Sequence, residues 1–186
     1  MTHPVDPPLG VVLSSSRGFD GAWLHVRVDS VRLPSGRIAT REVLEHPGAV
    51  AIVAITRDSK VLLLRQAHHP IQRVLLGLPA GTLEPGEEPE ACARRELMEE
   101  TGYKAGTMTR IASYFTSPGY TSEQLTIFLA EDCSFAAGEI DPDELIAVVP
   151  TPVHEIPVLV APGPEQVQDA KTLIGLLLLC QLHGLR

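Results

Sequence analysis

The sequence has few cysteines, few basic residues and no long apolar segment. Its three cysteines, Cys92, Cys133 and Cys180, are an odd number and lie far apart. This spacing argues against a disulfide framework and against a zinc site of paired cysteines. The most apolar run, residues 173–180, is far shorter than the roughly 20 residues that a membrane-spanning helix needs. We therefore expect a reduced, cytoplasmic protein without a membrane partner.

Basic side chains are outnumbered: 15 Lys and Arg stand against 23 Asp and Glu, a formal net charge of −8. A chain that binds nucleic acid through a basic face has the opposite balance, so we expect no nucleic-acid partner. The first residues, Met1-Thr2-His3-Pro4, show neither the basic nor the apolar stretch of a signal peptide, and we expect none. The overall composition, 44% hydrophobic over 186 residues, is typical of one globular domain, or of one domain with an arm.

Strand and helix patterns are mixed along the chain, which predicts a layered fold. Residues 23–31 alternate apolar and polar side chains, the turn signal 34–36 follows, and residues 38–44 can pair back as a hairpin. Further strands are expected at residues 48–55, 61–64, 124–130 and 147–149. Helices are expected at 90–101 and 165–182, the first bounded by Pro89 and Gly102. The first dozen residues, rich in proline, are expected to be loose.

Residues 81–103 place a glycine- and proline-rich loop before a short helix that carries several carboxylates. Glu96, Glu99 and Glu100 are three or four residues apart, so they share one helical face. Their charges repel unless a cation lies among them, and carboxylate oxygens are ligands that Mg²⁺ and Mn²⁺ prefer. For an arbitrary group of glutamates, a solvated acidic helix face is the usual alternative.

Two further features favour a built site over a solvated face. Arg95 can pair with Glu87 and so fasten the loop to the helix, and the backbone carbonyl of Ala80 could complete a metal coordination sphere. The glycines at fixed offsets and the terminal Glu-Glu-x-Gly complete a pattern that a solvated face does not need.

This pattern resembles the Nudix box, Gly-x5-Glu-x7-Arg-Glu-U-x-Glu-Glu-x-Gly-U with U a bulky apolar residue, running from Gly81 to Tyr103. The resemblance implies an α/β fold: a Nudix α/β/α sandwich with a mixed central sheet, preceded by an N-terminal β-hairpin arm. It also implies hydrolysis of a nucleoside diphosphate linked to another moiety, with Mg²⁺ (or Mn²⁺) as cofactor. Glu96 and Glu100 would be the principal metal ligands, with Glu99 close by.

The flanking residues are similar to the ADP-ribose pyrophosphatase branch of that family. Pro118 lies sixteen residues beyond Gly102, and residues 41–50, 78–81 and 169–173 agree as well. The resemblance implies that water attacks the diphosphate of ADP-ribose, giving AMP and ribose 5-phosphate. It also implies a homodimer with exchanged arms, in which residues 1–45 form an N-terminal tail and dimer-forming β arm and residues 46–186 form the hydrolase domain.

Within this branch, the resemblance points to five substrate-binding residues, which are Arg41, Arg65, His68, Pro118 and Gly119. Two departures bear on the choice of substrate. His68 stands where relatives usually have the arginine of Gln-x-Arg, and Gly77 stands where they often have glutamate. Histidine is only partly charged at neutral pH and has no fork of donors, so it holds a phosphate less firmly than arginine does. A different nucleoside diphosphate sugar therefore stays open as the substrate.

The resemblance to this branch also implies that the general base is a glutamate on a downstream loop. Glu144, directly before Leu145, is the best match, Glu139 is the second choice, and Glu99 on the helix completes the candidate catalytic set; each loop residue has a solvated acidic loop as its alternative. A non-catalytic nucleotide sensor on the same fold is the rival from another class. The intact carboxylate set argues against it. Between residues 84 and 144 the chain carries 14 acidic and 4 basic residues, so the negative charge is concentrated where this site is expected.

Overall fold

The computed structural model describes residues 6–136, 145–163 and 166–185. The two loop candidates for the general base, Glu139 and Glu144, lie outside these residues. The chain divides into two compact units, one formed by Met1–Pro47 with Phe115–Glu123, the other by Gly48–Tyr114 with Gln124–Arg186.

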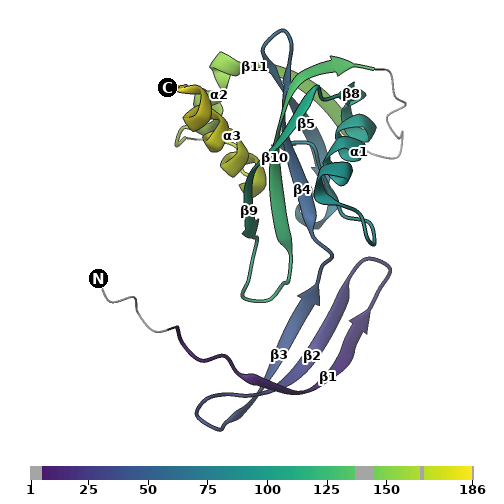
Figure 1. Cartoon of the computed structure of the whole chain (residues 1–186), viewed down its shortest axis with the longest axis vertical. Helices are drawn as coiled ribbons and strands as arrows, with labels where there is room; N and C mark the ends of the chain where they lie inside the picture. The colour runs from purple at the N-terminus through teal and green to yellow at the C-terminus, as the bar shows by residue number, and fades with distance from the viewer. Residues whose placement is uncertain (1–5, 137–144, 164–165, 186) are drawn as a thin grey trace. The chain divides into compact units, whose positions relative to one another are not determined.

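The first unit contains a three-stranded antiparallel sheet in the order β1-β2-β3 (Figure 1). Strands β2 (His25–Arg32) and β3 (Ile38–Glu45) form the predicted hairpin, closed by a turn in which Leu33 N donates to Arg37 O at 2.8 Å. The expectation that the first dozen residues are loose is wrong at its end, because β1 begins at Val11. Strand β1 (Val11–Asp20) pairs with β2 although its sequence, Val-Val-Leu-Ser-Ser-Ser-Arg-Gly-Phe-Asp, has no clear alternation.

The second unit is built on a sheet in the order β11-β5-β4-β10-β8, with β6, β7 and β9 paired to its members. Strands β4 and β10 run parallel, whereas the pairs β10–β8, β11–β5, β4–β5, β4–β7 and β5–β6 run antiparallel, so the sheet is mixed, as predicted. The bounds are β4 (Ala49–Thr56), β5 (Lys60–His68), β6 (Arg73–Gly77), β7 (Ala80–Thr82), β8 (Tyr103–Lys104), β9 (Thr107–Phe115), β10 (Gln124–Phe135) and β11 (Ile146–Pro152).

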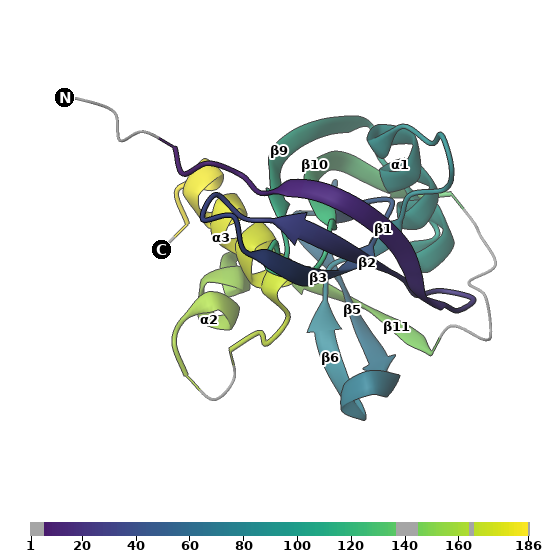
Figure 2. The same cartoon turned by 90° about the horizontal axis from the view of Figure 1, so that it is seen from below.

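Helices cover both faces of this sheet (Figure 1). The alternating side chains of β4 separate two cores: Val50, Ile52 and Ala54 pack with α1 (Pro89–Thr101), while Ala51 and Val53 pack with α3 (Ala170–His183). This is the predicted α/β/α sandwich. Figure 2 shows the same elements from below, with α2 (Ile156–Val160) next to α3. Short 3-10 helices, η1 (His69–Ile71) and η2 (Val153–Glu155), complete the unit.

The two long helices differ in how well their bounds were predicted. Helix α1 ends at Gly102, which adopts a positive φ of 74° as a C-cap, as its sequence indicates. Helix α3 begins at Ala170, not at residue 165, because Asp169 is extended and accepts a hydrogen bond from Thr172 N at 3.2 Å. No helix within the described parts of the chain is both long enough and apolar enough to span a membrane.

Candidate functional site

The loop before α1 is fastened to the helix by a bidentate ion pair. Arg95 donates from Nε and Nη2 to the two carboxylate oxygens of Glu87, at 2.9 and 3.0 Å, and Glu84 N donates to the same carboxylate at 3.0 Å. These donors, the guanidinium first, lower the pKa of Glu87 from 4.5 to about 2. The predicted pairing of loop and helix is therefore present.

The same guanidinium reaches two of the three candidate metal ligands. Arg95 Nη1 donates to Glu96 Oε1 at 2.7 Å and to Glu99 Oε2 at 2.9 Å. The sequence predicts that a cation must lie among these carboxylates, and in the structure Arg95 is such a cation. Glu87, Glu96 and Glu99 all hold the pKa of Arg95 above its ordinary value, with Glu87 as the largest cause.

Glu100 faces away from this guanidinium and into the protein. It is only 3% exposed, and its Oε2 accepts a hydrogen bond from Ala80 N at 2.8 Å. Ala80 is itself paired with Ala51 in the sheet, so the contact ties α1 to β7. Burying a carboxylate costs folding free energy unless the group is paired or binds a metal ion. The buried position of Glu100 is therefore typical of a functional site and not of a solvated helix face.

Gly81 provides the space in which the carboxylate of Glu96 lies. A Cβ atom at residue 81 would overlap this carboxylate, so a glycine is required there for Glu96 to lie against the backbone of β7. The side chain of Glu96 is 13% exposed and that of Glu99 is 54% exposed. Glu96 is therefore mostly buried beside β7, whereas Glu99 is about half exposed at the surface of α1.

This donor set fits a hard divalent cation in its chemistry, since it consists of carboxylate oxygens next to a backbone strand. Within residues 6–136, 145–163 and 166–185, no three His, Cys, Asp or Glu side chains lie close enough together to hold a metal ion. In the present conformation Glu96 and Glu99 face Arg95, and Glu100 faces Ala80. Arg95 bonds to one oxygen of each of its two partners on α1, Oε1 of Glu96 and Oε2 of Glu99.

Two candidate substrate residues, Arg65 and His68, lie on β5 but not on the same face. Val61 and Leu63 pack in the core with α3, whereas Leu62 packs in the core with α1. Because side chains alternate along a strand, His68 shares the face of Leu62 and Arg65 shares the opposite face. The structure does not bring these two candidates together.

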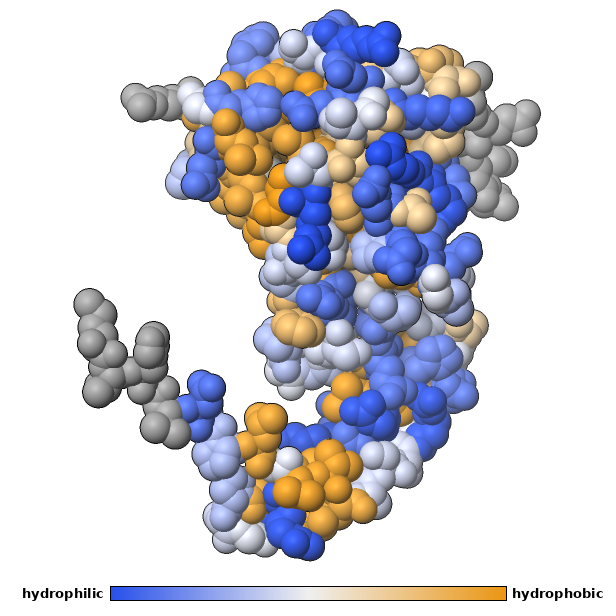
Figure 3. Space-filling model, viewed as in Figure 1, coloured by the Kyte–Doolittle hydropathy of each residue, from blue (hydrophilic) through white to orange (hydrophobic). Residues whose placement is uncertain are grey.

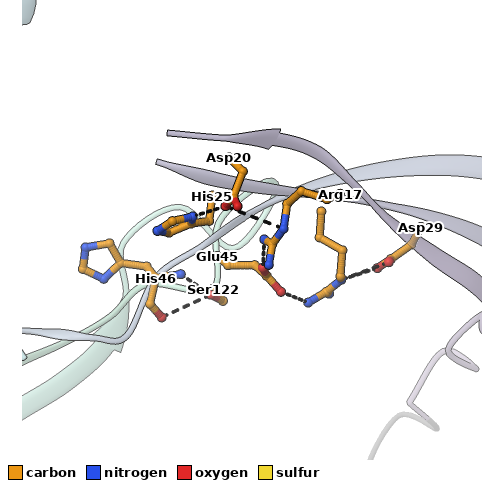
Figure 4. Close-up of polar contacts among 8 residues, drawn as sticks. Arg17, Asp20, His25, Asp29, Glu45, His46 and Ser122 are labelled. Atoms are coloured by element: carbon orange, nitrogen blue, oxygen red, sulfur yellow. Dashed lines mark hydrogen bonds and ion pairs between the residues drawn. The ribbon is translucent and has the colours of Figure 1, made fainter. Parts of the chain in front are cut away.

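The remaining candidates, Arg41, Pro118 and Gly119, belong to the first unit. Arg41 lies on β3 and donates to the carbonyl of Thr40 at 2.9 Å. The loop that carries Pro118 and Gly119 is joined to the end of β3, where Leu44 N donates to Tyr120 O at 2.8 Å and Ser122 N donates to Leu44 O at 3.1 Å. His46 N also donates to Ser122 Oγ at 2.9 Å (Figure 4). Arg41 and this loop are thus held in one compact unit.

An ion-pair network in the first unit was not predicted. Glu45 accepts from Arg17 at 2.5 Å and from Arg27 at 2.6 Å, and Arg27 also contacts the buried carboxylate of Asp29 at 2.9 Å (Figure 4). Hydrogen bonds from Arg27 lower the pKa of Asp29, and those from Arg17 and Arg27 lower the pKa of Glu45. Polar, titratable residues at every second position of β2 (25, 27 and 29) were the available signal, because they share one face of the strand.

Comparison with known proteins assigns the class of protein. Residues 45–173 match the NUDIX domain and residues 11–44 match the nucleoside diphosphate sugar hydrolase N-terminal domain. The chain therefore belongs to the Nudix family, and the predicted family is confirmed.

The chain is similar to proteins of known name and to one solved structure. The chain is 42% identical over 156 residues to an ADP-ribose pyrophosphatase of Bacillus subtilis (strain 168), covering 83% of each chain. It is 34% identical over 155 residues to a GDP-mannose pyrophosphatase of Yersinia enterocolitica, covering 78% of this chain and 79% of the relative. A crystal structure of an ADP compounds hydrolase superposes with a TM-score of 0.83 at 24% identity over 97% of both chains, which confirms the predicted fold.

Proposed function

We propose that this Nudix protein is a pyrophosphohydrolase that cleaves the diphosphate of a nucleoside diphosphate sugar, with ADP-ribose as the first candidate and AMP and ribose 5-phosphate as products. The observation that carries the proposal is the placement of the α1 carboxylates against β7, with Glu96 in the space left by Gly81 and Glu100 bonded to Ala80. The names of the two relatives support the same class of substrate.

Nudix hydrolases are generally dependent on a divalent metal. In this chain Glu96 and Glu100 would hold Mg²⁺ or Mn²⁺, with Glu99 and the carbonyl of Ala80 as further ligands. A divalent ion, when bound, neutralises the diphosphate and makes water more acidic. Arg95 would keep Glu96 and Glu99 together on one face of α1, while Glu87 holds Arg95 in place.

We place the general base on Glu144, with Glu139 as the second choice and Glu99 as the candidate on α1. A carboxylate within hydrogen-bond reach of the attacking water takes its proton as the bond to phosphorus forms. The support for Glu144 and Glu139 is their position on the acidic loop of the sequence. Glu99 is supported by its exposure and by its place beside Glu96.

For substrate binding we propose His68, which lies on the α1 face of β5, together with Arg41, Pro118 and Gly119 of the first unit. Their contacts would be with phosphate oxygens and sugar hydroxyls, since these residues offer a cation, an imidazole and exposed backbone. Arg65 lies on the α3 face of β5, so it would contact the substrate only through a part of the substrate that extends to that face.

We also propose that residues 1–45 form an arm that pairs with a second copy of the chain, and that residues 46–186 form the hydrolase domain. The support is apolar surface on the arm, which Figure 3 shows as a group of orange residues. The exposed apolar residues are Leu9, Val11, Val12, Leu13, Phe19, Trp23, Leu24 and Ile38. A cytoplasmic location is part of the same proposal, because Cys92, Cys133 and Cys180 are free thiols.

The test is a panel of nucleoside diphosphate sugars, ADP-ribose and GDP-mannose among them, incubated with Mg²⁺ or Mn²⁺ and read as products by mass spectrometry. The proposal predicts the highest kcat/KM for ADP-ribose. A higher value for another sugar would support the alternative that His68 and Gly77 mark a different nucleoside diphosphate sugar. Turnover of none of them, with binding retained, would support the nucleotide sensor instead.

A further inference from the structure

Three neutral polar side chains are hydrogen-bonded to one another on the neighbouring strands β9 and β10. Gln124 Nε2 donates to Ser113 Oγ at 3.1 Å, and Ser113 Oγ is hydrogen-bonded to Thr126 Oγ1 at 3.3 Å. Thr126 is buried, whereas Ser113 and Gln124 are exposed. This polar row, Ser113, Thr126 and Gln124, therefore presents one amide and one hydroxyl to solvent, next to a buried hydroxyl that holds the latter.

The polar row lies on the face of the sheet that packs with α1. Leu125 packs in the core with α3, whereas Phe128 packs in the core with α1. Because side chains alternate along a strand, Thr126 and Gln124 share the face of Phe128. The hydrogen bonds of Ser113 to both residues place its side chain on the same face.

The pairing of the strands places this row in line with the carboxylate of Glu96. Val50 of β4 is paired with Gly81 of β7 on one side and with Thr126 of β10 on the other. Directly paired residues share a face, and the carboxylate of Glu96 occupies the space at Gly81. Two strand spacings, about 10 Å, therefore separate the backbone of Gly81 from that of Thr126.

The polar row marks the point at which this face of the sheet changes from apolar to polar. Farther along β10, Phe128 and Ala130 are buried in the core with α1. Of the described residues of β9, Met108 packs against that core, and it lies near the opposite end of the strand from Ser113. Ser113 and Gln124 are thus outside the part of the face that α1 buries.

The chemistry of the row suits hydroxyl groups. An amide and a hydroxyl both donate and accept hydrogen bonds, and neither carries a charge. Sugar hydroxyls have the same double capacity, whereas phosphate oxygens are bound most strongly by charged donors. A nucleobase binds by stacking on an aromatic side chain, and the row contains none. Among the described residues, the contact with Ser113 uses one amide proton of Gln124 and leaves its Oε1 and second proton for a ligand.

We propose that Ser113 and Gln124 bind hydroxyl groups of the sugar that the diphosphate joins to the nucleoside, and that Thr126 positions Ser113 for this contact. A substrate whose diphosphate lies at the α1 carboxylates would extend its sugar along the sheet to the row. The inference rests on the proposed function for the place of the diphosphate, and it adds the residues that select the sugar. Polar groups that a wrong sugar leaves unpaired disfavour its binding.

The experiment compares a ligand that has this sugar with one that lacks it. ADP-ribose is the substrate of the full-length protein with Mg²⁺, and ADP, which ends at its diphosphate, is the competitive inhibitor. We expect Gln124→Leu to raise KM for ADP-ribose roughly 5-fold or more, because a hydrogen-bonding amide is lost. The kcat and the inhibition constant of ADP should stay within about 2-fold. Gln181→Leu, at an exposed glutamine of α3, is the matched control and should change none of these quantities.

Thr126 is tested through its hydroxyl. Thr126→Val removes the hydroxyl at nearly constant volume, so it should raise KM for ADP-ribose without changing the inhibition constant of ADP. Thr126→Ser keeps the hydroxyl and should restore KM. A purely structural role would instead weaken ADP-ribose and ADP alike. Such a shared loss in either the Thr126→Val or the Gln124→Leu variant would overturn the sugar site.

The outcomes separate this site from the proposed function. Turnover of ADP-ribose with the same KM in Gln124→Leu and Gln181→Leu leaves the function standing and removes the sugar site. If no turnover occurs, calorimetric titration of ADP-ribose in Mg²⁺ gives the affinity directly. A loss of affinity in Gln124→Leu that Gln181→Leu does not share then supports the site while the function fails. Neither turnover nor binding by the unchanged protein would overturn both.

Discussion

The carboxylate of Glu96 lies where the Cβ of residue 81 would be if that residue were not glycine. Gly81 is held in β7 by its pairing with Val50, and Glu96 is held on α1, so the contact relates sheet and helix directly. Space for this one side chain is what lets an acidic helix face lie against a strand. It distinguishes the arrangement from a solvated helix face, which needs no such space.

Replacing Gly81 by alanine should therefore impair the site more than the fold. The atoms that the new methyl would meet are the far end of the flexible Glu96 side chain, which can turn away at low cost. We expect kcat/KM to fall at least 10-fold while the free energy of unfolding changes by less than about 1 kcal/mol. Gly163→Ala, which meets no atom within 4 Å, is the control and should alter neither quantity. Full activity of the Gly81→Ala variant would contradict the placement of Glu96.

The Glu87–Arg95 pair predicts a stability that depends on pH. The folded protein holds the pKa of Glu87 at about 2, below its ordinary value of 4.5. A depressed carboxyl pKa stabilises the fold above the unfolded value, and this contribution is lost as pH falls from about 4.5 toward 2. Urea unfolding between pH 6 and pH 3 should show a shallower decline for Glu87→Gln than for the unchanged protein. Glu88→Gln, at the neighbouring residue, should keep the full decline, and an equal decline in all three proteins would remove the ion pair from the account.

The hydrogen bonds at the start of α3 connect this helix to the strand segment that leads to Ala80 in the candidate site. Thr172 is fully buried; its Oγ accepts from Leu78 N at 2.8 Å and donates to Asp169. Thr172→Val leaves the Leu78 N–H without its acceptor, which costs about 1–3 kcal/mol of unfolding free energy. Because Leu78 leads to Ala80, kcat should fall as well. Thr172→Ser keeps the hydroxyl and should restore most of both quantities, so a Ser variant as impaired as the Val variant would contradict the role given to the hydroxyl.

Light scattering on a size-exclusion column tests the proposed arm. The 186-residue chain has a mass of 20.1 kDa, and we expect twice this mass in solution. Lysines at Val12 and Phe19, both more than half exposed on β1, should shift the protein toward the monomer because they place charge in the paired surface. Val158→Lys, at an exposed apolar residue of α2 outside the arm, should leave the mass unchanged. A monomeric unchanged protein would contradict the arm pairing.

Local signals predicted much of this fold. The apolar run of β4, the Pro89 start and Gly102 stop of α1, and the Arg95–Glu87 pair are each encoded within a few residues or helical turns of the chain. Strand β1 was missed because its central Ser-Ser-Ser-Arg-Gly carries no apolar alternation and is held by backbone pairing with β2. The start of α3 was placed too early because helix formers precede Asp169, whose capping role depends on Thr172.

The sequence singled out the carboxylates of α1 as site candidates, and their role stays a prediction; the residues around them could not be derived from local patterns. Arg65 and His68 are three residues apart on a strand, and an odd spacing places them on opposite faces. The joining of the Pro118 loop to the end of β3 depends on contacts between residues more than 70 positions apart, which no local pattern specifies. The role of Arg95 as a cation among Glu87, Glu96 and Glu99 likewise required the geometry of both loop and helix.

The most direct test of the central claim is hydrolysis of ADP-ribose in ¹⁸O-labelled water with Mg²⁺, read by mass spectrometry. We predict that the unchanged protein yields AMP and ribose 5-phosphate with one label per turnover. Glu100→Gln should reduce this yield at least 100-fold, because it removes the buried charge of the proposed metal site. Glu90→Gln, which breaks only the exposed pair with Arg94 on the same helix, should turn over like the unchanged protein. Labelled products at full rate from the Glu100→Gln variant would contradict the claim that the α1 carboxylates carry the reaction.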